Sequence, residues 1–161
     1  LGVTTVYVTH DQEEAMAISD YVVIMNSGQV EQAGSPEEIY FEPRNCFVAD
    51  FIGGVNLIPG RMTGPDEAEI LGRRVPVRNP HGAAVGQEVK VAVRPEEVTL
   101  GDGPFSGTVR RAVFLGRVTE YVLQVGDQRL VAVMHGQHRR MPEGAETAFS
   151  FNPGAPLALT R

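Results

Sequence analysis

His10 is the residue of this sequence best placed to take part in chemistry. It follows the run Thr4–Thr9, whose β-branched and aromatic residues are typical of a strand buried on both faces of a sheet. In α/β folds, ligand sites form at the carboxyl ends of such strands. An imidazole there can donate a hydrogen bond to oxygens that gather charge, as in phosphoryl transfer. A histidine at a strand end is more often structural than functional, so the residues around it decide the interpretation.

The elements that would position His10 follow at once along the chain. Asp11 is a predicted N-cap for a helix that ends near Asp20, and Glu14 stands at the reciprocal position of a capping box. A second strand is predicted over Tyr21–Met25. Strand, helix and strand with short joints indicate an α/β arrangement.

The next segment predicts a hairpin and two short helices. The turn residues 26–28 (Asn-Ser-Gly) should join the second strand to residues 29–34 as a hairpin. Ser35, Pro36 and Glu38 have the types and spacing of a helix start with a capping box, and that helix should run to about Tyr40. A further helix is predicted over 45–52.

From Asn56 onward the pattern changes to short apolar runs separated by Gly, Pro and Asp. Many short strands at such spacing indicate a small barrel or sandwich. The predicted strands are Leu57–Met62, Ala68–Leu71, Arg74–Val77, Glu88–Val93, Val98–Leu100, Gly107–Phe114, Val118–Val125, Leu130–Met134, Thr147–Phe151 and Leu157–Thr160.

The charge changes at the same point as the pattern. The net charge of −6 divides into −8 over residues 1–55 and +2 over residues 56–161, which favours two domains with these bounds. Neither part carries a dense basic stripe, and the chain has no Trp, so a nucleic-acid surface is not favoured. No apolar run is long enough for a spanning helix. The single cysteine, Cys46, suits a reducing cytoplasm and is best read as a buried inert thiol.

Three motifs stand close together in the first part of the chain. They are Val8-Thr9-His10-Asp11-Gln12-x-Glu14-Ala15, Asp20-x-Val22-x-Ile24-Met25-x-x-Gly28-Gln29-Val30-x-Gln32-x-Gly34-x-Pro36-x-Glu38-x-Tyr40, and Phe47-Val48-Ala49-x-Phe51-Ile52-Gly53 with Asn56. Through these motifs, residues 1 to about 56 resemble the ATPase subunits of ABC importers, in particular those serving sugars, polyamines and ferric iron. The chain begins inside a strand-like run, without an initiator Met, so we expect it to be a piece of a longer protein.

The resemblance implies a role for His10 that this chain cannot fulfil alone. In the family the matching residue is the switch histidine, which contacts the γ-phosphate of ATP across a nucleotide-sandwich dimer. The chain has no phosphate-binding loop, no family signature sequence and no strand ending in the acidic pair that holds magnesium. We therefore expect Mg-ATP to be a cofactor of a longer parent protein only, with no cofactor and no metal bound by this chain.

A second resemblance lies in the later region. Arg94-Pro95-Glu96 after a predicted strand resembles the Arg-Pro-Glu of the transport-associated OB (TOBE) domain, and 107–121 resembles its next hairpin. In the family this domain makes regulatory and dimer contacts and in some members binds an effector. For Arg94 we favour a satisfied structural role over a regulatory one. His135 and His138 have no further ligand at metal spacing, so two solvated histidines in a loop are the better interpretation.

Together these observations predict a mostly β chain: an α/β remnant of a P-loop ABC ATPase domain over 1–55, then an OB-like TOBE barrel over 56–161. The parent would couple ATP hydrolysis to solute import as a homodimer at the inner face of the cell membrane, with permease subunits and a solute-binding protein. Two alternatives stay open: a stand-alone barrel that binds small oxyanions, and an OB-fold nucleic-acid binder, which would need stacking aromatic side chains and a basic groove.

Overall fold

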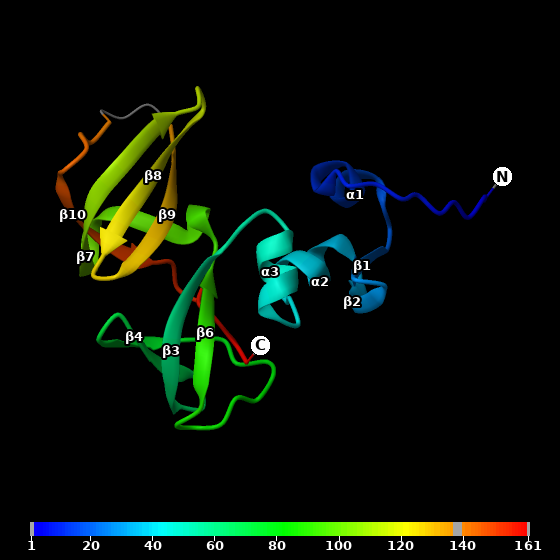
Figure 1. Ribbon diagram of the computed structural model, residues 1–161, viewed down its shortest axis with the longest axis horizontal. Helices are drawn as coiled ribbons and strands as arrows, with labels where there is room; N and C mark the ends of the chain where they lie inside the picture. The colour runs from blue at the N-terminus through cyan, green and yellow to red at the C-terminus, as the bar shows by residue number, and fades with distance from the viewer. Residues whose placement is uncertain (1, 137–139, 161) are drawn as a thin grey trace.

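The computed structural model describes residues 2–136 and 140–160, and the fold is mostly β, as predicted. The N-terminal part holds three short helices and one hairpin, and the later part holds the remaining strands (Figure 1). The N-terminal elements are α1 (Gln12–Ile18), β1 (Val22–Asn26), β2 (Gln29–Gly34), α2 (Pro36–Phe41) and α3 (Cys46–Phe51).

Two antiparallel sheets build the later part of the chain. Their elements are β3 (Asn56–Gly64), β4 (Glu67–Ile70), β5 (Arg73–Pro76), β6 (Glu88–Val93), the 3-10 turn η1 (Pro95–Glu97), β7 (Val98–Phe114), β8 (Val118–Val125), β9 (Gln128–His135), β10 (Glu146–Phe151) and β11 (Leu157–Leu159). One sheet has the order β11-β6-β3-β4-β5 and the other the order β10-β7-β8-β9. The predicted strands of this region are confirmed, and β6 and β8 have the predicted bounds.

Strand β7 differs from the prediction, because residues 98–100 and 107–114 belong to one continuous strand. Glycines let it bend: Gly101 and Gly103 have φ of 102° and 136°. A Cβ at Gly103 would lie 2.2 Å from the carbonyl oxygen of Phe149 on β10, so only glycine permits this approach. The turn residues that suggested a loop therefore mark a bend inside a strand.

The two sheets enclose one apolar core. Ile58 and Val91 from the first sheet and Tyr121 and Phe149 from the second are at most 1% exposed and belong to one cluster. Phe105 of β7 stacks on Phe149 with ring centroids 5.2 Å apart. This shared core joins the two sheets into one small β unit, in agreement with the predicted mostly β fold.

The strand predicted over residues 4–9 is not formed, so that prediction is wrong. Residues 2–9 have no regular structure and extend away from the barrel (Figure 1), and Val6 and Val8 are both 88% exposed. A central strand needs neighbours that accept and donate its backbone hydrogen bonds. Within the described residues no strand pairs with this segment, and the only partner of β1 is β2.

The local signals of the N-terminal part were more reliable. Asp11 caps α1 by accepting from the Glu14 amide at 3.0 Å, but Glu14 does not close the box, because its carboxylate accepts from the Tyr7 hydroxyl instead. The capping box of Ser35 and Glu38 is confirmed. The antiparallel hairpin β1-β2 is also confirmed. No helix in the described part of the chain is long and apolar enough to cross a membrane.

Candidate functional site

His10 lies in the exposed segment just before α1. Among residues 2–136 and 140–160 it forms no hydrogen bond, and it does not meet Arg94, Pro95 or Glu96. The structure therefore separates His10 from the Arg94-Pro95-Glu96 motif. This motif lies where the helices meet the barrel.

Arg94 joins the barrel to the C-terminal ends of two helices. It follows β6 directly, and Pro95 then starts η1. Its guanidinium donates to the carbonyl oxygens of Tyr40 at 3.1 Å, Ala49 at 3.0 Å and Gly54 at 2.9 Å, and also to that of Ile52. The last carbonyls of a helix have no partner inside the helix, so a cationic donor there satisfies groups that would otherwise stay unpaired.

Tyr40 completes the surroundings of this guanidinium. The Arg94 Cζ lies 4.2 Å from the centroid of the Tyr40 ring, a distance at which the cation and the ring attract each other. The Tyr40 hydroxyl donates to a carboxylate oxygen of Glu96 at 2.5 Å. Burial and this bond to Glu96 raise the pKa of Tyr40 to about 12, and burial lowers the pKa of Arg94. Arg94 thus contacts the ring of Tyr40 and Glu96 binds its hydroxyl, so the two residues hold this side chain from both ends.

Two further donors of the barrel reach the turn between α2 and α3. Arg78 Nη2 donates to the Phe41 carbonyl at 3.1 Å, and His81 Nε2 lies 3.1 Å from the Pro43 carbonyl, to which it donates. We call Arg78, His81 and Arg94, with the carbonyls that accept from them, the carbonyl clasp. These carbonyls belong to Tyr40, Phe41, Pro43, Ala49, Ile52 and Gly54. The clasp consists entirely of side chains of the barrel holding backbone of the helical part.

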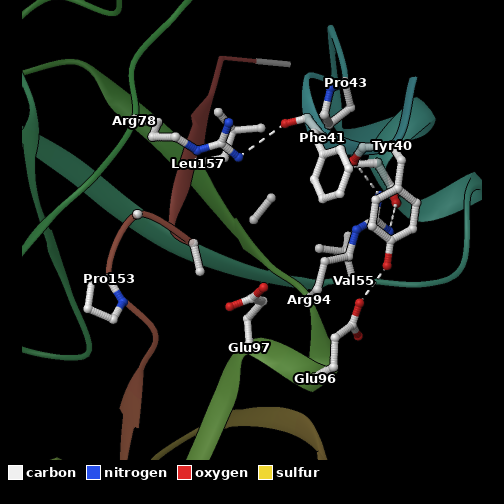
Figure 2. Close-up of a pocket in the computed structure, with 14 residues that line it drawn as sticks. Tyr40, Phe41, Pro43, Val55, Arg78, Arg94, Glu96, Glu97, Pro153 and Leu157 are labelled. Atoms are coloured by element: carbon white, nitrogen blue, oxygen red, sulfur yellow. Dashed lines mark hydrogen bonds between the residues drawn. The ribbon is translucent and has the colours of Figure 1, made fainter. Parts of the chain in front are cut away.

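A pocket of about 550 Å³ lies beside the clasp, between α2 and the barrel (Figure 2). Its walls are mainly apolar, and Arg78, Arg94, Glu96 and Glu97 supply its charged groups. Sequence reasoning identified Arg94 and Glu96 but missed Tyr40, Arg78 and His81 as members of this junction. Tyr40 was visible only as a residue of the matched motif, and nothing near Arg78 distinguishes it from the other arginines.

The two histidines interpreted as solvated loop residues, His135 and His138, lie partly outside the described residues. His135 ends β9 and is exposed, while His138 is not among the residues that the structure describes. In the part that is described, no group of three His, Cys, Asp or Glu side chains is arranged to hold a metal ion.

Comparison with known proteins shows what this chain is similar to. Residues 91–159 match the model of the TOBE domain. The chain is 37% identical to the spermidine/putrescine import ATP-binding protein PotA of Oleidesulfovibrio alaskensis, over 99% of this chain and 46% of that protein. It is 37% identical to the Fe(3+) ions import ATP-binding protein FbpC of Rhizobium etli, over 98% of this chain and 46% of that protein. The chain is a relative of the C-terminal region of ABC importer ATP-binding subunits.

Two more comparisons describe the extent of this likeness. The PotA protein of Acetivibrio thermocellus is 47% identical over 72% of this chain and 34% of its own length. A crystal structure of the cytoplasmic molybdate-binding protein ModG, with molybdate bound, matches 66% of this chain and 96% of its own, with a TM-score of 0.50 at 15% identity. The ModG likeness shows a shared fold. The chain spans about half the length of the curated relatives it matches, 46% in the first two.

Proposed function

We propose that this chain serves as the C-terminal regulatory region of an ATP-binding subunit whose ATPase part lies in preceding sequence. The observation that carries the proposal is the carbonyl clasp, because it ties the TOBE-containing barrel to the ends of α2 and α3. Because the clasp holds α2 and α3 to the barrel, a movement of the barrel would move these helices with it. Coupling between the barrel and the ATPase part would need a connecting element of this kind.

His10 has a role only in this longer protein. There it would contact the γ-phosphate of Mg-ATP and help to place the attacking water, while the phosphate-binding loop and the magnesium ligands come from residues outside this chain. Its exposure in the present structure suits a side chain whose partners belong to another part of the protein or to a second subunit.

The partners and location follow from the same proposal. The longer protein would work as a homodimer, docked from the cytoplasm onto membrane-spanning permease subunits that receive solute from a binding protein. The names of the relatives include both polyamine and ferric-iron import, so they do not select one solute.

A chimaera tests the proposal directly. This chain would replace the matching C-terminal region of the Acetivibrio thermocellus PotA protein, which it matches at 47% identity, and spermidine uptake would be measured with the cognate permease. We expect ATP-dependent uptake by the chimaera, and a loss of roughly a hundredfold in ATP turnover on His10→Ala with little change in ATP affinity. A folded chimaera that binds permease but hydrolyses ATP equally well with and without His10 would overturn the assignment of this residue.

A further inference from the structure

Two charged side chains that line the pocket beside the carbonyl clasp, Arg78 and Glu97, have hydrogen-bonding capacity that the described residues do not fill. Figure 2 shows Arg78 on one side of it and Glu97 on the other, with Phe41 above and Arg94 beside them. The pocket lies between the helical part and the barrel, so a molecule in it would touch both. No comparison assigns a ligand to it.

Arg78 supplies a guanidinium whose hydrogen-bonding capacity is not filled. Only its Nη2 has a partner, the Phe41 carbonyl, and its Nε is buried with no hydrogen-bond partner among the described residues. The backbone of Arg78 is fixed on both sides, since its amide donates to Pro156 and its carbonyl accepts from Ala158. Because its Nε is closed off, this guanidinium can donate to a carboxylate in the pocket only through its terminal nitrogens.

Glu97 supplies the opposite charge. Its backbone is held by η1 and by the Asn152 amide, which donates to its carbonyl at 2.9 Å. The half-buried carboxylate accepts no hydrogen bond and forms no ion pair within the described part of the chain, where the recorded ion pair joins Arg74 and Glu67. A carboxylate in a partly apolar pocket favours a cationic partner.

The surface between these charges is apolar. Leu157 is 3% exposed and Phe41 is 57% exposed, and both line the pocket. A simple anion would meet repulsion from Glu97, and a diamine would meet repulsion from Arg78. A molecule with a negative group for Arg78, a positive group for Glu97 and an apolar spacer between them avoids both repulsions.

We propose that this pocket binds a small zwitterion whose carboxylate lies against Arg78 and whose ammonium lies against Glu97, with an apolar chain between them. The ligand bridges α2 and the barrel and so strengthens the junction. The regulatory consequence rests on the proposed function above, but the binding itself does not.

The test is calorimetry on the whole chain with 6-aminohexanoate as the probe. We expect a dissociation constant of about 1 mM or below, which is an ordinary affinity for so few atoms. Hexanoate and hexylamine each lack one charge and should bind about tenfold more weakly, and 1,6-diaminohexane should not bind better than the probe. Equal binding of the probe and either one-charge analogue, or tightest binding of the diamine, would overturn the proposal.

Variants locate the site. Glu97→Gln and Arg78→Met should each weaken binding of the probe about tenfold, while the exposed controls Glu143→Gln and Arg73→Met should not. Because Arg78 also belongs to the clasp, Glu97→Gln decides the matter if Arg78→Met does not fold. Unchanged affinity of Glu97→Gln refutes the site. Failure of the PotA chimaera to transport, with normal binding of the probe, would refute the proposed function and leave the pocket intact.

Discussion

The side-chain amide of Asn56 exchanges two hydrogen bonds with the backbone of Val131. Its Nδ2 donates to the Val131 carbonyl at 2.8 Å, and its Oδ1 accepts from the Val131 amide at 2.6 Å. Asn56 opens β3 in one sheet, whereas Val131 lies in β9 at the edge of the other. The Asn56 side chain therefore takes the place of a neighbouring strand at this point of the β9 edge, and it links the two sheets.

Asn56→Ala should lower the free energy of unfolding by about 2–4 kcal/mol, because it leaves a donor and an acceptor of β9 without partners. Asn56→Asp should be destabilising too, since the carboxylate keeps an acceptor for the Val131 amide but sets an oxygen against its carbonyl. Urea denaturation at neutral pH measures both. A fully stable Asn56→Asp chain would show that the bond to the carbonyl contributes nothing.

Arg94→Met should cost about 2–4 kcal/mol of stability, because several carbonyls at the ends of α2 and α3 lose a charged donor. Arg94→Lys should recover less than half of this loss, since an ammonium lacks the planar fork and the stacking on Tyr40. The control is the exposed Arg74→Met, which loses only an ion pair of 3.9 Å and should change stability by less than about 0.5 kcal/mol. Equal effects of the changes at Arg94 and Arg74 would contradict the importance of the clasp.

Hydrogen exchange can separate a clasp from ordinary packing. In Arg94→Met the amide of Ile52, which bonds to Val48 in α3, should exchange faster, while Leu123 in the barrel core should exchange as before. Uniformly faster exchange throughout the chain would indicate a general loss of stability instead.

The sequence was sufficient for features that depend on nearby residues. The capping box at Ser35, the hairpin at 26–28 and strands such as Glu88–Val93 were predictable, because turn chemistry, caps and alternation are local signals. The strand at Thr4–Thr9 was predicted from composition alone. It is not formed because a strand exists only with a neighbour, and the described residues provide none for this segment.

The junction was harder to predict, because its members lie far apart along the chain. The Arg94 motif was visible in the sequence, and its helical partners were not: the accepting groups are backbone carbonyls, which every residue possesses. Tyr40 and Glu96 are separated by 56 positions, and only the fold brings the hydroxyl and the carboxylate together. Periodicity and spacing carry no information about such pairs.

Tyr40→Phe should remove the bond to Glu96 and cost about 1 kcal/mol at neutral pH. The pKa of Tyr40 is raised to about 12 from an ordinary 10, so its contribution to stability is complete below pH 10 and is lost as the pH rises toward 12. The stability difference between the parent chain and Tyr40→Phe should therefore shrink between pH 10 and 12. Denaturation at pH 7, 9, 10 and 11 would measure this, and a difference that grows with pH would contradict it.

The chain by itself should show no nucleotide affinity of consequence. A phosphate-binding loop provides most of the donors to the phosphates, and this sequence contains none. Calorimetry with Mg-ATP is the measurement. A dissociation constant in the micromolar range would mean that the chain holds a nucleotide site of another kind.

The exposed apolar residues before β2 should make the chain associate with itself. Val6 and Val8 are 88% exposed in a segment that pairs with no strand of the described residues, and Met25 on the hairpin is 56% exposed, so the N-terminal part presents apolar side chains together with unpaired backbone. A second copy can cover this surface with the same segment in a two-fold arrangement. Light scattering at tens of micromolar should therefore give the mass of a dimer, and Val6→Asp with Val8→Asp should shift it toward the monomer. Val85→Asp is the matched control, because Val85 is 64% exposed but lies on the barrel. A monomeric parent chain, or an equal response to Val85→Asp, would show that this surface does not drive association.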